Sequence, residues 1–85
     1  MKTLLKFEAP WCASCKVLSN LLKGTDLTSI DVVPINIDAD TASAKAYGVR
    51  GLPTLIFLDE TGEETKRISG ALNKDELINF LGGTQ

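Results

Sequence analysis

The order strand, helix, strand in the first 38 residues constrains the fold more than any other feature of this sequence. Residues 3–8 alternate apolar side chains with a period of two, residues 12–23 place them at helical spacing, and residues 30–38 form a second apolar run. A unit of this length normally makes two parallel strands joined by a right-handed crossover. Because 85 residues leave room for only one core, we expect a single α/β domain spanning residues 1–85.

The second half of the chain adds two strands and two helices. Residues 41–47 are expected to form a short helix, and residues 54–58 and 64–69 an antiparallel hairpin. A last helix begins after Asn73 and frays at Gly82-Gly83. The sequence therefore predicts a sheet with both parallel and antiparallel neighbours.

Pro34 lies inside the second predicted strand. Proline has no backbone N–H, so it removes one hydrogen bond from the ladder and is tolerated mainly at a sheet edge. This strand is therefore expected to be outermost.

Charge and hydrophobicity exclude several classes of protein. Nine basic and eleven acidic residues give a net charge of −2, and neither sign forms a block, so we expect no nucleic-acid or membrane partner. The apolar run after Met1 stops at Lys6, too early for a signal peptide, and no stretch approaches the ~20 apolar residues of a membrane span. The expected location is the cytoplasm, or the host cytoplasm if a phage encodes the protein.

Cys12 and Cys15, the only cysteines, lie where the first strand gives way to the first helix. Residues three apart on a helix are about 5–6 Å apart, which suits a disulfide. Unpaired N–H groups and the helix dipole favour a thiolate at Cys12. A disulfide across four residues constrains the unfolded chain by only about 2 kcal/mol, so a reversible bond is a better explanation than a structural one.

Two other interpretations of the cysteine pair are a metal site and two inert thiols. Zinc or an iron–sulfur cluster needs about four protein ligands, whereas this chain has two thiols and no histidine. We therefore expect no metal. Trp11, the only tryptophan, directly precedes Cys12 and is expected to be partly exposed on a docking surface, although a plain core position is the alternative.

At these residues the chain resembles the thioredoxin family. The resemblance extends from Met1 to about Leu81, but the chain starts at what would be the family's second strand and is similar to shortened thioredoxins of some archaea and phages. It rests on Trp11-Cys12-x-x-Cys15-Lys16, Asn36-Ile37-Asp38, the segment from Tyr47 to Thr54, and Gly70-Ala71-Leu72.

The resemblance implies a thioredoxin-like three-layer sandwich. Its four-stranded mixed sheet would have the order 2-1-3-4, with the first and third helices on one face and the short second helix on the other. The implied function is reduction of protein disulfides through a Cys12–Cys15 dithiol/disulfide cycle, with no cofactor beyond that pair. The implied partners are protein disulfides and a thioredoxin reductase or similar electron donor, and the protein is expected to be a monomer.

The resemblance also implies roles for four residues around the cysteines. Pro53 would follow a cis peptide bond beside the pair, and the backbone of Leu52 would pair with an incoming peptide as an added strand. Gly70 and Ala71 would form a flat rim of the docking surface.

The chain departs from the family's usual pattern at three places. Ala13-Ser14 replaces Gly-Pro between the cysteines, from which we expect a reduction potential less negative than about −270 mV. Lys6 replaces a buried aspartate that helps move the proton of the second cysteine, and Pro34 replaces that aspartate's lysine partner. Lys6 would favour thiolates if its charge lies near Cys15, or have little effect if it extends to solvent.

Two other functions stay open at this point. One is a glutaredoxin-like enzyme recharged by glutathione, although the aromatic residue usual between the cysteines of such sites is missing here. The other is a non-catalytic binding subunit that uses the fold as a docking surface.

Overall fold

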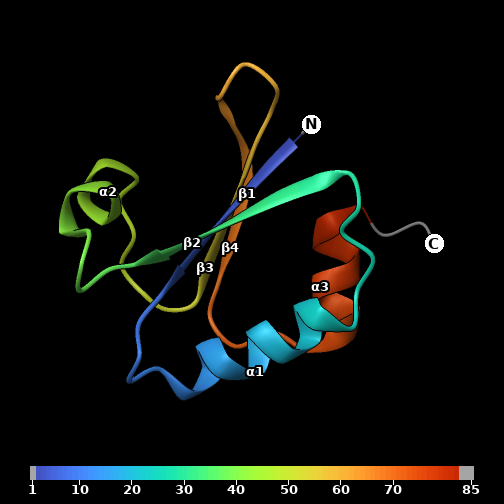
Figure 1. Ribbon diagram of the computed structural model, residues 1–85, viewed down its shortest axis with the longest axis horizontal. Coiled ribbons are helices and arrows are strands. Elements are labelled where there is room, and N and C mark those ends of the chain that lie inside the picture. Colours follow the sequence, from blue (N-terminus) through green and yellow to red (C-terminus); the bar gives the residue numbers. More distant parts are fainter. Residues whose placement is uncertain (1, 83–85) are drawn as a thin grey trace.

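The computed structural model describes residues 2–82 and is built on a four-stranded mixed sheet (Figure 1). The strands are β1 (Lys2–Glu8), β2 (Ile30–Asn36), β3 (Thr54–Leu58) and β4 (Glu64–Ser69), in the order β2-β1-β3-β4. β1 pairs with β2 in parallel, whereas β3 is antiparallel to both β1 and β4. This order is the predicted one.

Pro34 is exposed on the edge strand β2, as its missing N–H predicts. β2 ends at Asn36, two residues earlier than expected. The carbonyl of Asn36 accepts the N–H groups of Ala39 and Asp40, and its side-chain oxygen accepts the N–H of Asp38. These bonds turn the chain out of the sheet toward the next helix.

Three helices connect or follow the strands, namely α1 (Ala13–Lys23), α2 (Thr41–Ala46) and α3 (Lys74–Leu81). Cys12 is the N-cap of α1 and not its first residue. Asn73 and Glu76 form the predicted capping box of α3, in which each side chain accepts the backbone N–H of the other residue. Gly82 caps the end of this helix, and Gly83 lies outside the described residues.

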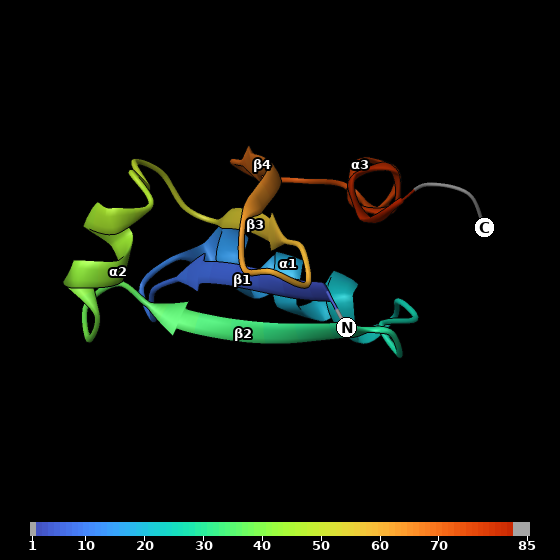
Figure 2. The same ribbon diagram turned by 90° about the horizontal axis from the view of Figure 1, so that it is seen from above.

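The helices cover opposite faces of the sheet, which makes the three expected layers (Figures 1 and 2). The alternation of β1 sends Leu4 to the face covered by α1 and α3, and Leu5 to the face where α2 packs. In Figure 1, α2 lies at the left end of the molecule, whereas α1 and α3 lie next to each other at the lower right. The buried cluster of the first face consists of Leu4, Leu18, Leu22, Leu55, Phe57, Leu77 and Phe80.

Candidate active site at the N-terminus of α1

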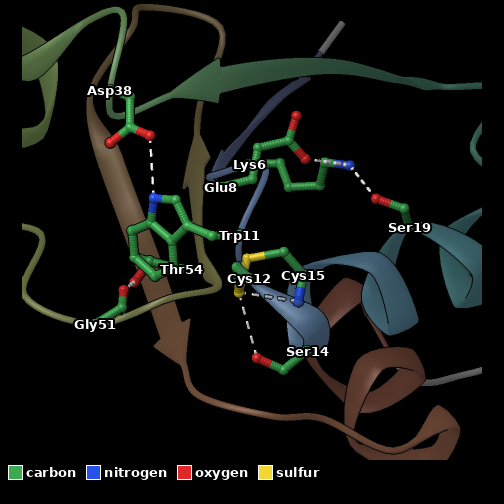
Figure 3. Close-up of a disulfide and its surroundings, with 10 residues drawn as sticks. All are labelled: Lys6, Glu8, Trp11, Cys12, Ser14, Cys15, Ser19, Asp38, Gly51 and Thr54. Atoms are coloured by element: carbon green, nitrogen blue, oxygen red, sulfur yellow. Dashed lines mark hydrogen bonds and ion pairs between the residues drawn. A yellow bond between two sulfur atoms is a disulfide. The ribbon is translucent and has the colours of Figure 1, made fainter.

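The two cysteines lie where β1 has ended and α1 begins (Figure 3). Their Cα atoms are 5.2 Å apart, and their sulfurs form a disulfide. The N–H of Cys15 points at Sγ of Cys12 at 3.1 Å, so the sulfur occupies the place of an ordinary capping oxygen. The same N–H would stabilise negative charge on Cys12 once the disulfide is opened.

Ser14 adds a second polar contact to the first sulfur. Its Oγ lies 3.4 Å from Sγ of Cys12 (Figure 3). A hydroxyl can rotate to donate its hydrogen to a thiolate, which the imide nitrogen of a proline at this position could not do. This serine is one of the two residues that depart from the usual Gly-Pro.

Trp11 is 67% exposed, as predicted, and does not occupy the core position that was the alternative. Its Nε1–H donates to Oδ2 of Asp38 at 3.0 Å, and Figure 3 shows the indole turned toward that carboxylate. Asp38 follows the end of β2, so the turn at Asn36 places the partner that holds the indole.

A groove of about 680 Å³ opens beside the first cysteine. The peptide bond between Leu52 and Pro53 is cis, as the resemblance implies, and Pro53 is buried. The carbonyl of Pro53 accepts the N–H of Gly70 at 2.9 Å, which ties that glycine to the loop. The groove is lined by Trp11, Cys12, Ile37, Val49, Arg50 and Leu52, among others.

Gly70 has φ of 94°, a conformation that favours glycine, and Ala71 next to it is exposed. Neither residue lines the groove itself. The structure thus brings Trp11 and Leu52 together with Cys12, and connects Gly70 to this region through Pro53.

Cys15 opens onto a different cavity, of about 200 Å³, which is also lined by Glu8, Ser19 and Asn36. Direct exposure hardly separates the two cysteines, since Cys12 is 6% and Cys15 3% exposed. The two cysteines differ in the pocket that each one lines, which is the large groove for Cys12 and the small cavity for Cys15.

Lys6 is buried at 9% exposure and does not extend to solvent. Its Nζ donates to Oγ of Ser19 at 2.6 Å and forms an ion pair with Glu8 at 2.8 Å (Figure 3). The ammonium is therefore neutralised by a carboxylate from its own strand, and its effect on the cysteines depends on that partner.

Among the described residues, no group of three or more histidine, cysteine, aspartate or glutamate side chains could hold a metal ion. The same part of the chain contains no helix long and apolar enough to cross a membrane.

Sequence reasoning did not single out Glu8, Ser19 or Asp38 as site residues. A signal for Glu8 was present, because the period of two that sends Lys6 to the α1 face sends Glu8 there as well. The pairing of Asp38 with Trp11 spans 27 positions and had no signal of this kind.

A disulfide closed at a helix N-terminus, beside a groove on a β-α-β sheet, defines a thiol–disulfide oxidoreductase of thioredoxin-like fold. A family model described as Thioredoxin matches residues 1–82. The chain belongs to the thioredoxin family.

Relatives and solved structures agree with this assignment. The chain is 38% identical to the thioredoxin of Chlamydia caviae over 80 residues, which cover 92% of this chain and 78% of that protein. A mutant thioredoxin of Halobacterium salinarum superposes with a TM-score of 0.82 at 34% identity, covering 93% of this chain and 70% of that one. The germline-specific thioredoxin Deadhead of Drosophila melanogaster gives a TM-score of 0.85 at 28% identity, covering 94% and 77%. The chain is accordingly an enzyme that exchanges thiols and disulfides.

Proposed function

We propose that Cys12 attacks the disulfide of a protein substrate and that Cys15 resolves the mixed disulfide. The observation that supports this assignment is that Cys12 lines the groove of about 680 Å³, which has room for a substrate segment, whereas Cys15 lines a separate cavity of only about 200 Å³. The N–H of Cys15 and the hydroxyl of Ser14 support a thiolate on Cys12 and not on Cys15.

The cycle balances as two successive exchanges. The Cys12 thiolate displaces one substrate sulfur, which leaves as a thiolate with the electron pair of the broken bond and is protonated by solvent. Cys15, after losing its proton, then attacks Sγ of Cys12 and displaces the second substrate sulfur. The substrate disulfide gains two electrons and two protons, and the two enzyme thiols become the disulfide.

The same proposal assigns the docking surface. Trp11 provides an exposed aromatic face beside Cys12, and Asp38 holds its indole in place. The backbone of Leu52 pairs with an extended substrate segment, while Gly70 and Ala71 present no bulky side chain against it. Pro53 has no N–H that could compete for the sulfurs.

Single cysteine variants test the two roles. Cys15→Ser should accumulate mixed disulfides with substrate because nothing resolves them, whereas Cys12→Ser should form none at a comparable rate. Mass spectrometry after mixing each variant with oxidised insulin measures both. Equal trapping by the two variants would contradict the assignment.

For the electron donor we propose a thioredoxin reductase and not glutathione. The Cys pair would be the only redox group. The protein would act as a monomer in the cytoplasm. Insulin reduction should be fast with NADPH and thioredoxin reductase and slow with glutathione. Faster reduction with glutathione would favour the glutaredoxin-like alternative. Retention of biological function by a double Cys→Ser variant would favour the binding subunit.

The Ala13-Ser14 dipeptide should also shift the reduction potential. We expect a value less negative than about −270 mV, because Ser14 adds a donor that stabilises the reduced thiolate. Equilibration against glutathione measures it, and a value at or below −270 mV would contradict this expectation.

A further inference from the structure

The resolving step requires that Cys15 lose its thiol proton, and Cys15 is 3% exposed. The cavity that it lines holds about 200 Å³, room for several water molecules at about 30 Å³ each. The remaining lining side chains decide where the proton can go, since bulk solvent has little direct access to the sulfur.

Only one of the described residues that line this cavity carries a carboxylate. Glu8 of β1 lines this cavity together with Cys15, and Lys6 of the same strand forms an ion pair with it. Lys16 and Ser19 of α1 line the cavity as well. The remaining polar side chain, Asn36 of β2, does not accept protons at neutral pH. The two lysine ammonium groups have no free lone pair, so Glu8 is the only base among these groups.

The Glu8 carboxylate is held in place. Lys6 binds its Oε1 at 2.8 Å and is itself fixed by Oγ of Ser19, so β1 and α1 are joined by one chain of polar contacts beside the disulfide (Figure 3). The Glu8 side chain remains 28% exposed, so a proton that reaches it can leave to solvent.

We infer that Glu8 accepts the proton of the Cys15 thiol, through water in this cavity, when Cys15 resolves the mixed disulfide. The S–H bond of Cys15 breaks as its thiolate attacks Sγ of Cys12. The bond between Cys12 and the substrate sulfur breaks, and that sulfur leaves with the electron pair. The proton passes from the carboxylic acid of Glu8 to the leaving thiolate or to solvent. This inference rests on the proposed roles of Cys12 and Cys15.

The experiment follows a reduced protein in excess over an aromatic disulfide such as dithionitrobenzoate, in a stopped-flow instrument. Attack by Cys12 releases one coloured thiolate, and resolution by Cys15 releases the second. Because an aromatic thiolate leaves without needing a proton, the rate of the second phase reports on the deprotonation of Cys15. A wild-type protein that shows no second release would refute the proposed function itself.

Glu8→Gln keeps the size of the side chain and removes the base. At pH about 7 roughly one in thirty thiols with a pKa near 8.5 is ionised, so the second phase should slow by about tenfold and approach the wild-type rate above pH about 9. The first phase should stay unchanged. A purely electrostatic role predicts the opposite sign, since removal of a negative charge lowers the pKa of Cys15 and speeds the second phase.

An unchanged or faster second phase at neutral pH in Glu8→Gln would therefore overturn the inference. Added formate, a small base, should restore the second phase in the variant but not accelerate the wild type. If the second phase of Glu8→Gln is slow and formate does not restore it, the role of Glu8 is structural, and this result would also overturn the inference. Asp31→Asn is the matched control, because it removes an exposed carboxylate from β2 and should leave both phases unchanged.

Should Glu8→Gln fail to fold, the same pH series on Glu8→Asp decides the question. This variant keeps the carboxylate but withdraws it from the cavity by one methylene group. Its second phase should be slow below the pKa of the thiol and normal above it, and a wild-type rate at every pH would overturn the inference.

Discussion

At the scale of single residues, Oγ of Ser14 lies against Sγ of Cys12, the sulfur to which we assign the attacking role. We predict that Ser14→Ala raises the pKa of Cys12 by up to about one unit, or about 1.4 kcal/mol, because the thiolate loses a donor. The pH dependence of iodoacetamide alkylation in a Cys15→Ser background measures this pKa. Ser14→Thr, which keeps a hydroxyl, is the control, and equal pKa values in all three proteins would exclude the contact.

Lys6 is a second residue that we expect to affect the cysteines, in this case through its charge and its ion pair with Glu8. Lys6→Met leaves the Glu8 carboxylate without its partner beside the cavity of Cys15. The pKa of the Cys15 thiol should rise, because a nearby uncompensated negative charge disfavours the thiolate. Alkylation of Cys15 against pH in a Cys12→Ser background measures the change, and an unaltered pKa would remove Lys6 from the mechanism.

At the scale of elements, the turn between β3 and β4 depends on one carboxylate. The hydroxyl of Thr61 and the N–H groups of Glu63 and Thr61 lower the pKa of Asp59 below its ordinary value, in that order of effect. The folded state therefore binds this proton less readily than the unfolded chain does. The stabilisation is complete above the unfolded pKa of about 3.9 and is lost as the pH falls through the lower folded value.

Asp59→Asn should accordingly differ from the wild type most at neutral pH. The stability advantage of the wild type should shrink as the pH falls below about 4, because the amide does not titrate in this range. Urea unfolding across this range measures the difference. A constant difference between the two proteins at every pH would contradict the role of Asp59.

The alternation of side chains along β1 also determines which residues reach the site. Leu4, Lys6 and Glu8 share one face, and Cys15 and Ser19 share the facing side of α1 four residues apart. The contacts from Glu8 through Lys6 to Ser19 therefore lie on the same face of β1 as the apolar core and beside Cys15. Two regular elements packed face to face determine which side chains meet there.

For the whole molecule, stability rests on two small cores on either side of one sheet. Leu55 of β3 is fully buried in the cluster that also contains side chains of α1 and α3. Leu55→Ala should cost about 2–5 kcal/mol of unfolding free energy, because it leaves a cavity as well as losing apolar contact. Typical stabilities of about 0.05–0.15 kcal/mol per residue mean that this loss is a large part of the total.

Val17→Ala on the exposed side of α1 is the control for Leu55→Ala. Val17 is 55% exposed, so its truncation should change the unfolding free energy by no more than about 0.5 kcal/mol. Denaturant unfolding of both oxidised variants measures these values. Similar losses at the two positions would contradict the division between core and surface.

The resemblance to the thioredoxin family implied the order of the strands, whereas the residues themselves predicted the edge position of β2, the helix that begins at the cysteines and the capping box of α3. Each of these last three features depends on local rules: a period of two or 3.6, a missing N–H at Pro34, or a capping side chain three residues from its partner. The exposure of Trp11 was expected from its position before Cys12, and the cis bond before Pro53 was implied by the family resemblance.

Tertiary structure alone decided which polar groups meet around the sulfurs. The bond from Lys6 to Ser19 spans 13 positions and that from Trp11 to Asp38 spans 27, so neither has a pattern in the sequence. They form because β1 packs beneath α1 and because β2 turns out of the sheet at Asn36. Local residues thus determined the fold and the cysteine chemistry, while the environment that tunes each cysteine arose from elements distant in the chain that pack together.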